Sequence, residues 1–234
     1  MDINFEIKKI ADKERAKNLS RFFKTGKGDY GEGDKFLGIA VPQLRGLCKK
    51  YWKEISFDET QRLIYSEFHE KRLLGLFILI ERFKHSSEIE HTNIFNFYLK
   101  CAKENKINNW DLVDLSAPNL VGRYLIDKDK SILYSLAKSS NLWERRISVL
   151  ATFYFIKEKK FDDSLKIAEI LLEDKHDLIH KAVGWMLREI GKRDLKVEEA
   201  FLKKHYKKMP RTMLRYSIER FEEGKRLRYL NGEI

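Results

Sequence analysis

Cysteine and proline are scarce in this chain of 234 residues, and long apolar runs are missing. It contains two cysteines, Cys48 and Cys101, and three prolines. Two isolated thiols are most simply buried apolar residues of a cytosolic protein, although a single disulfide is an alternative. No apolar run approaches the ~20 residues that span a bilayer, and the acidic Asp2 and Glu6 are unlike a signal peptide. We therefore expect a cytoplasmic protein with no membrane partner.

Alternating Val, Ile and Thr residues between tight turns are also missing, which argues against β-strands. Helical periodicity is strong instead, because apolar residues recur every three or four positions in residues 69–83 and 143–156. We predict about a dozen helices of roughly 10–16 residues, joined by short polar loops.

A faint internal repeat accompanies these helices. Residues 70–73 (EKRL) resemble residues 144–147 (ERRI), at an offset of 74 residues. Half of that offset is about 37, and a period of ~37–47 residues with paired helices is typical of HEAT-type arrays. The predicted fold class is therefore all-α, a curved solenoid of HEAT-like antiparallel helix pairs that forms a single domain over residues 1–234.

The net charge of +11 is unevenly distributed. Residues 1–50 carry +5 and residues 201–234 carry +6, while the three intervening blocks of 50 residues carry −1, +2 and −1. Basic ends favour a polyanionic partner such as nucleic acid, although a basic soluble protein without such a partner is the alternative. The Gly-rich residues 25–38 lack the spacing of a P-loop. We interpret them as a flexible connection whose amides, Lys27 and Lys35 are minor candidates for phosphate contact.

Three tryptophans stand beside charged residues, each within one predicted helical turn: Trp110, Trp143 and Trp185. Trp110 and Asp114 are four residues apart and share a helix face. An indole beside a carboxylate can hold a cation, and a fixed carboxylate can stabilise the oxocarbenium-like sugar of N-glycosidic cleavage. Core packing of Trp110 with a structural hydrogen bond at Asp114 is the alternative. The intervening Asp111 is expected to be solvated or to cap the helix.

Further cations flank the other two tryptophans. Arg145 and Arg146 follow Trp143, and the planar guanidinium suits bidentate phosphate contact. At least one of them is expected to reach the surface, with a surface salt bridge as the alternative. Lys181, Trp185 and Arg188 share a helix face, so the ring could stack on a base or sugar while the cations meet phosphates. A half-buried tryptophan between helices is the alternative.

No metal or cofactor site is predicted. His176 and His180 superficially resemble the zinc-binding His-Glu-x-x-His pattern, but the second position is an aspartate and no third ligand stands out.

At these tryptophan segments the chain resembles the AlkD-like DNA alkylation repair family of all-helical, HEAT-like solenoids. The likeness rests on Trp110-Asp111-Leu112-Val113-Asp114 with Pro118 and Gly122, on Asn141-Leu142-Trp143 with Arg146, on residues 181–189 (KAVGWMLRE), and more weakly on residues 36–39 with Pro42 and Arg45. It extends from about residue 20 to about residue 220.

The resemblance implies a metal-free, monomeric DNA glycosylase. Such an enzyme excises alkylated, cationic purines such as 3-methyladenine and 7-methylguanine from double-stranded DNA, as part of base excision repair. By motif, Asp114 would be the catalytic carboxylate, Trp110 and Trp185 the aromatic walls around the lesion, and Arg146 the clamp on the DNA backbone. Arg145, Lys181 and Arg188 are the further DNA-binding candidates. A non-catalytic DNA-binding solenoid that recognises distorted duplexes and a protein–protein scaffold are the alternatives.

Overall fold

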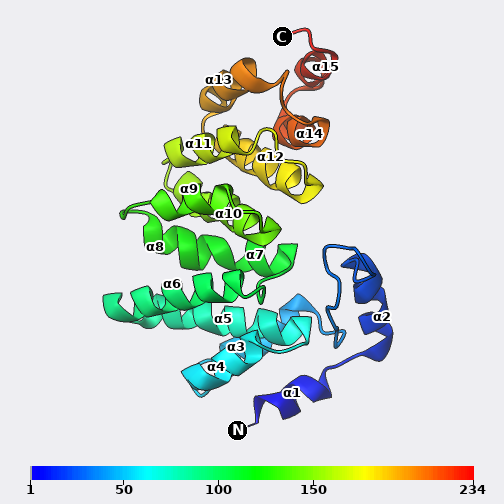
Figure 1. Ribbon diagram of the computed structural model, residues 1–234, viewed down its shortest axis with the longest axis vertical. Helices are drawn as coiled ribbons and strands as arrows, with labels where there is room; N and C mark the ends of the chain where they lie inside the picture. Colours follow the sequence, from blue (N-terminus) through cyan, green and yellow to red (C-terminus); the bar gives the residue numbers. More distant parts are fainter. Residues whose placement is uncertain (1) are drawn as a thin grey trace. The chain divides into compact units, whose positions relative to one another are not determined.

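The structure, a computed structural model, describes residues 2–234 and is helical throughout these residues apart from loops and one isolated β-bridge between Lys35 and Phe68 (Figure 1). The all-α prediction is confirmed. The chain divides into two compact units, unit 1 (Met1–Ser116) and unit 2 (Ala117–Ile234), and each is described by itself. A single domain over residues 1–234 stays a prediction.

Unit 1 is built around one long buried helix, α5. All residues from Leu73 to Ile80 are buried on α5, because α3, α4 and α6 pack against it. At Gly75 the approach of α4 is so close that a Cβ atom would lie 2.6 Å from Cγ1 of Ile64. The helices of unit 1 are α1 (Ile3–Lys9), α2 (Lys13–Phe22), α3 (Val41–Tyr51), α4 (Phe57–Ile64), α5 (His69–His85), α6 (Glu88–Lys103) and α7 (Trp110–Ala117), whose last residue already belongs to unit 2.

Unit 2 continues α7 through a wide π-helical turn and then alternates longer and shorter helices. Several helices are shorter than the predicted 10–16 residues. The elements are η1 (Pro118–Gly122), α8 (Arg123–Leu125), α9 (Ser131–Ala137), α10 (Leu142–Lys157), α11 (Asp162–Ile170), α12 (Asp177–Gly191), α13 (Leu195–His205), α14 (Arg211–Ser217), the 3-10 turn η2 (Ile218–Arg220) and α15 (Glu223–Asn231).

The helices α10, α12 and α14 lie side by side in unit 2 and run in the same direction. The N-terminal half of α10 meets that of α12 where Arg146 donates a hydrogen bond to the carbonyl of Leu178, and further along both helices Phe153 packs against Trp185. The helices α9, α11 and α13 pack against this row. Stacking of this kind is typical of helical-repeat proteins. The helices α10, α12 and α14 begin at Leu142, Asp177 and Arg211, which are 35 and 34 residues apart, so the repeat is slightly shorter here than the predicted ~37 residues.

Both cysteines are free and buried, as predicted for isolated thiols, because Cys48 and Cys101 contribute to the apolar core of unit 1. Within residues 2–234, no helix combines the length and the apolar character needed to span a membrane.

Candidate functional site

Trp110 begins α7 and lies in an aromatic cluster that the sequence patterns did not predict. Its ring is nearly parallel to that of Phe23, with centroids 5.3 Å apart and an angle of 15°, and it meets Phe22 edge-on at 6.1 Å. Phe23 is buried, Trp110 is half-buried, and Phe22 is 64% exposed. The first turn of α7 is fixed by Asn109, whose side-chain oxygen accepts a hydrogen bond from the Trp110 amide at 2.9 Å. The partly exposed indole of Trp110 is therefore held in place by the buried ring of Phe23 and by the capped first turn of α7.

Asp114 lies one turn beyond Trp110 on the same face of α7, as predicted from the spacing. It is half-buried. Burial, with a contribution from the negative charge of Asp114, raises the pKa of Tyr98, so the carboxylate stands close to this buried phenol. Unit 1 therefore places a half-buried carboxylate one helical turn from a partly exposed indole.

Asp111 is buried, so the prediction that it is solvated was wrong, whereas its bond to a first-turn amide of α7 agrees with the capping alternative. It is 6% exposed, and its Oδ2 accepts a hydrogen bond of 2.9 Å from Nε2 of His69. Its other oxygen accepts a bond from the Leu112 amide at 2.8 Å. The sequence missed this arrangement because the partner of Asp111 is 42 residues away on α5.

His69 lies between two carboxylates. Its Nδ1 donates to Oδ2 of Asp34 at 3.2 Å, while its Nε2 donates to Asp111. Burial alone would lower the pKa of His69, but the charge of Asp111 and the hydrogen bonds to both carboxylates raise it to about 9. His69 is therefore an imidazolium at neutral pH, packed flat against Phe36 with centroids 4.7 Å apart.

Asp34 also anchors the end of the Gly-rich segment, and flexibility of the remainder stays a prediction. It accepts hydrogen bonds from Arg72 at 2.7 Å and from the side chains of Asn108 and Asn109 at 3.1 Å each. Burial would raise the pKa of Asp34, but the bond from His69 and the charge of Arg72 hold it below its usual value. The end of the Gly-rich segment is thus pinned to α5 and α7.

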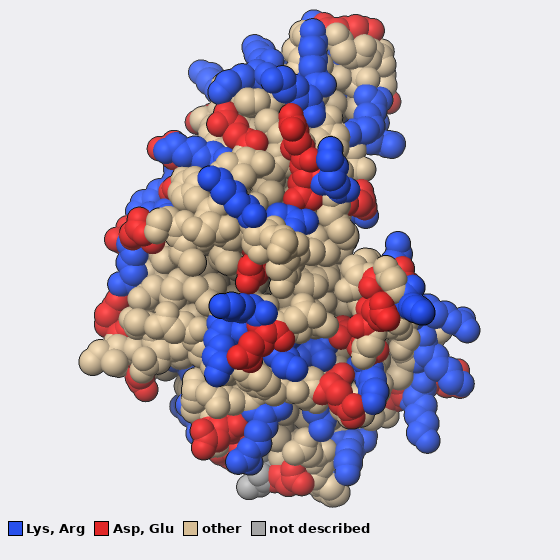
Figure 2. All heavy atoms as spheres, in the orientation of Figure 1, with Lys and Arg blue, Asp and Glu red and all other residues tan. Residues whose placement is uncertain are grey.

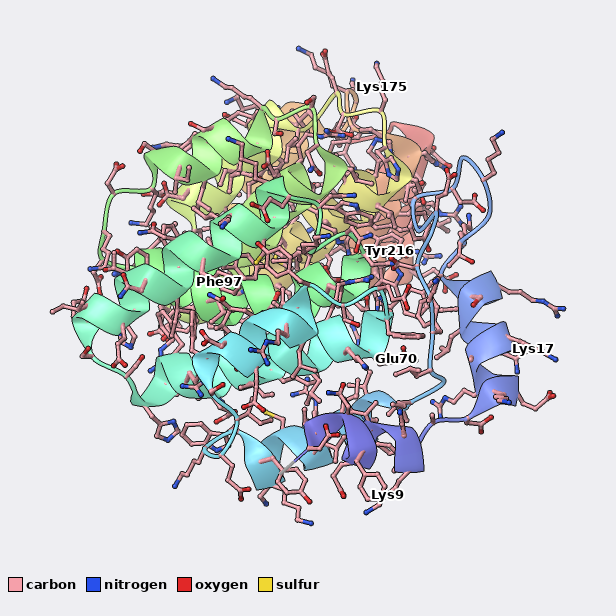
Figure 3. The ribbon with its side chains drawn as sticks, turned by 60° about the horizontal axis from the view of Figure 1, so that its bottom comes forward. Lys9, Lys17, Glu70, Phe97, Lys175 and Tyr216 are labelled. Carbon is pink, nitrogen blue, oxygen red and sulfur yellow. The ribbon has the colours of Figure 1, made fainter. Side chains whose placement is uncertain are left out.

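A second buried carboxylate fixes the residues that follow. Glu70, labelled in Figure 3, accepts hydrogen bonds from the amides of Leu37, Gly38 and Ile39 at 2.8–3.2 Å. Gly38 has a φ of +79°, and a Cβ atom there would lie 1.9 Å from the carbonyl oxygen of Asp12. Only glycine fits at this close approach.

Trp185 lies in unit 2, on α12. Its ring centroid is 5.8 Å from that of Phe153, and its Nε1 donates to Oε1 of Glu189 at 3.4 Å. The ring is half-buried, so it combines the predicted helix-helix packing with an exposed portion. Its helix neighbours have ionic partners: Lys181 contacts Asp177 at 2.5 Å, and Arg188 pairs with Glu219.

The two arginines of α10 are largely withdrawn from the surface. Arg146 is 5% exposed and bonds to the carbonyl of Leu178. Arg145 contacts Asp174 at 2.7 Å and keeps 17% of its side chain exposed, so it is close to the predicted salt-bridge alternative. We expected at least one of these arginines to reach the surface. Only Arg145 does so, and only a small part of its side chain is exposed.

His176 and His180 have structural partners. Nδ1 of His176 accepts a hydrogen bond from the Leu178 amide at 3.1 Å and caps α12, while Nε2 of His180 lies 2.5 Å from the carbonyl of Asp174. In residues 2–234, no group of three or more His, Cys, Asp or Glu side chains is arranged to hold a metal ion.

The predicted residues thus fall into two sets. Unit 1 brings together Trp110 and Asp114, to which the structure adds Phe22 and Phe23. Two adjacent phenylalanines at the end of α2 were the only sign of this cluster in the sequence. Their partner Trp110 lies too far along the chain for helical periodicity to connect them. Unit 2 carries the other candidates, which are Arg145, Arg146, Lys181, Trp185 and Arg188. Chemically, the unit 1 set can hold a flat, cationic group between ring and carboxylate.

Comparisons with known proteins give two matches. The family model described as "DNA alkylation repair enzyme" matches residues 3–221. A solved structure described as "Predicted DNA alkylation repair enzyme from Enterococcus faecalis" is similar, with a TM-score of 0.71 over 91% of this chain and 97% of that chain. At 18% sequence identity, this second likeness shows the fold alone. No curated protein matches the chain.

Proposed function

The chain belongs to the DNA alkylation repair enzyme family, and on that premise we propose that it is a DNA glycosylase. The proposed reaction is hydrolysis of the N-glycosidic bond of alkylated, cationic purines such as 3-methyladenine and 7-methylguanine in duplex DNA. The observation that carries the proposal is the pairing of Trp110 with Asp114 on one face of α7. This pairing supports binding and cleavage of a cationic nucleotide.

The chemistry needs few groups from the protein. An alkylated purine already carries a positive charge, so it leaves as a neutral base when the C–N bond breaks and takes the bonding electrons with it. A water molecule then adds its hydroxyl to C1′ of the deoxyribose and releases a proton. In this proposal the Asp114 carboxylate stabilises the oxocarbenium-like sugar and orients the water.

The remaining candidates bind and position the DNA in this proposal. Trp110 in unit 1 and Trp185 in unit 2 each provide an aromatic contact to the DNA, and the exposed Phe22 extends the aromatic surface formed by Trp110. Lys181 is the most exposed of the cations predicted for DNA binding, with 38% of its side chain exposed, and we assign it a direct phosphate contact. The others, Arg145, Arg146 and Arg188, would contact phosphate only if the DNA displaces their present partners.

The deciding experiment compares Asp114→Asn with the parental protein on a duplex that contains N7-methylguanine, by chromatography of the released base. Removing the charge should slow excision by at least ~100-fold, about 2.7 kcal/mol of transition-state stabilisation. Binding to the duplex should be nearly unchanged. Excision at the parental rate would contradict the catalytic assignment and favour a non-catalytic DNA-binding protein.

A matched control is Asp58→Asn. Asp58 is an exposed carboxylate in the first turn of α4, so it reproduces the change in net charge at another place in unit 1. Its excision rate should equal that of the parental protein. Asp111→Asn is not suitable as a control, because Asp111 forms a buried ion pair with His69.

A further inference from the structure

The end of α13 and the whole of α14 form a strongly basic segment in unit 2. Residues 200–218 contain six lysines and arginines and no aspartate or glutamate. Five of the six are exposed cations without a salt-bridge partner among the described residues, namely Lys203, Lys207, Lys208, Arg211 and Arg215. We call these five residues the C-terminal basic cluster. Figure 2 shows lysines and arginines gathered over α13–α15.

The nearby carboxylates are occupied by other cations. Glu169 of α11 contacts Lys204 and His205, each at 2.9 Å. Glu219 pairs with Arg188, and Glu199 pairs with Lys225. The charges of the cluster are therefore not neutralised within unit 2. Such an arrangement lowers stability through self-repulsion, and an anionic partner would offset this cost.

The cluster lies next to the part of α12 that carries Trp185. The helices α12 and α14 touch at Gly184, where a Cβ atom would lie 2.4 Å from the carbonyl of Met213 and 2.6 Å from Cβ of Tyr216. Arg211 and Arg215 are one turn apart on α14. A linear polyanion that reaches the exposed edge of Trp185 would therefore find cations on the next helix.

We infer that the C-terminal basic cluster is a contact for the phosphate backbone of duplex DNA that does not depend on a lesion. The inference takes only the ligand, duplex DNA, from the proposed function. Exposed lysines on flexible stems suit phosphates because they neutralise charge without reading sequence. The cluster lengthens the bound stretch of DNA and holds the protein on undamaged duplex.

The test measures the binding of an undamaged duplex by fluorescence anisotropy over a range of salt concentrations. The variant replaces Lys207, Lys208 and Arg215 together with glutamine. Each lost phosphate contact should reduce the slope of log K against log salt by ~0.9, so the triple variant should lose up to ~2.7. Arg211 is retained, because it bonds to the carbonyl of Leu230 and helps to hold α15.

The control replaces Lys157, Lys159 and Lys196 with glutamine. These three cations are also exposed in unit 2, but they lie at the C-terminal end of α10 or the start of α13. The control should keep at least most of the parental slope. An unchanged slope in the first variant, or an equal loss in both variants, would overturn the inference. Circular dichroism checks that both triple variants are folded. If the variant of the cluster is unfolded, the double variant Lys207→Gln/Lys208→Gln replaces it, and the slope should then fall by up to ~1.8.

This test is independent of excision. If the parental protein releases no base but the cluster variant loses slope, the DNA contact stands and the glycosylase proposal fails. If base release is normal and the slope does not change, the cluster is not a DNA contact and the glycosylase proposal stands.

Discussion

Replacing His69 with glutamine should remove most of the pH dependence that this residue gives to the stability of unit 1. The folded-state pKa of His69 is about 9, compared with 6.5 for an unperturbed histidine. This difference corresponds to about 3 kcal/mol, because one pKa unit is about 1.4 kcal/mol. It arises from the two carboxylates that accept hydrogen bonds from the buried imidazolium, Asp34 and Asp111.

The direction follows from the raised pKa. Below pH 6.5 His69 is protonated in both the folded and the unfolded chain, and the ion pairs contribute fully. Between pH 6.5 and 9 the unfolded chain loses its proton first, so the free energy of unfolding falls by about 3 kcal/mol. Above pH 9 this contribution is absent. His69→Gln keeps a hydrogen-bonding side chain but cannot carry the charge.

The assay is urea denaturation at several pH values between 6 and 9.5, with circular dichroism and with hydrogen exchange of the α5 amides as a local probe of unit 1. The quantity of interest is the parental free energy of unfolding minus that of the variant, since contributions from other groups cancel. This difference should shrink as the pH rises. A difference that is constant over the whole range would refute a charged His69 in the fold.

The remaining predictions concern two residues of unit 2, a glycine of unit 1 that serves as a control, and the reaction. Burial and the charge of Glu199 raise the pKa of Glu198 to about 8, so Glu198→Gln should increase stability at pH 8 by a few kcal/mol and have little effect near pH 4.5, as read from thermal melts. Gly184→Ala should lower the melting temperature, because its Cβ would lie 2.4 Å from the carbonyl of Met213. Gly46→Ala in α3, with no atom within 4 Å, should raise it slightly. EDTA should leave base release unchanged, and a loss that zinc restores would contradict the metal-free assignment.

The helices and the Trp110–Asp114 pairing could be predicted from the sequence because both depend on neighbours three or four residues away. Asp111 could not be placed in this way. It lies one residue from Trp110 on a different face, and what buries it is His69, on a separate helix. Periodicity describes which face of a helix is apolar, and it does not identify a buried polar partner.

Arg146 shows a second limit of the sequence patterns. Ile147 and Leu150 mark a buried stripe, which predicts an exposed face elsewhere on α10. In the structure α10 is packed by η1, α9, α11 and α12, so residues 146–152 are all buried. A helix that is covered from several directions has no polar face to reveal its orientation.

The Gly-rich segment has a practical consequence because it is fixed at both ends. The Gly31 amide closes it by donating to the carbonyl of Lys24 at 3.1 Å, and Asp34 is buried a few residues later. Residues 26–29 between these anchors are exposed. Gly28 has a φ of +82°, which favours glycine, so the exposed side chain of Lys27 is the better position for a label. A dye attached at Lys27 should leave these anchors undisturbed, and it would report on DNA arriving at Phe22 a few residues away.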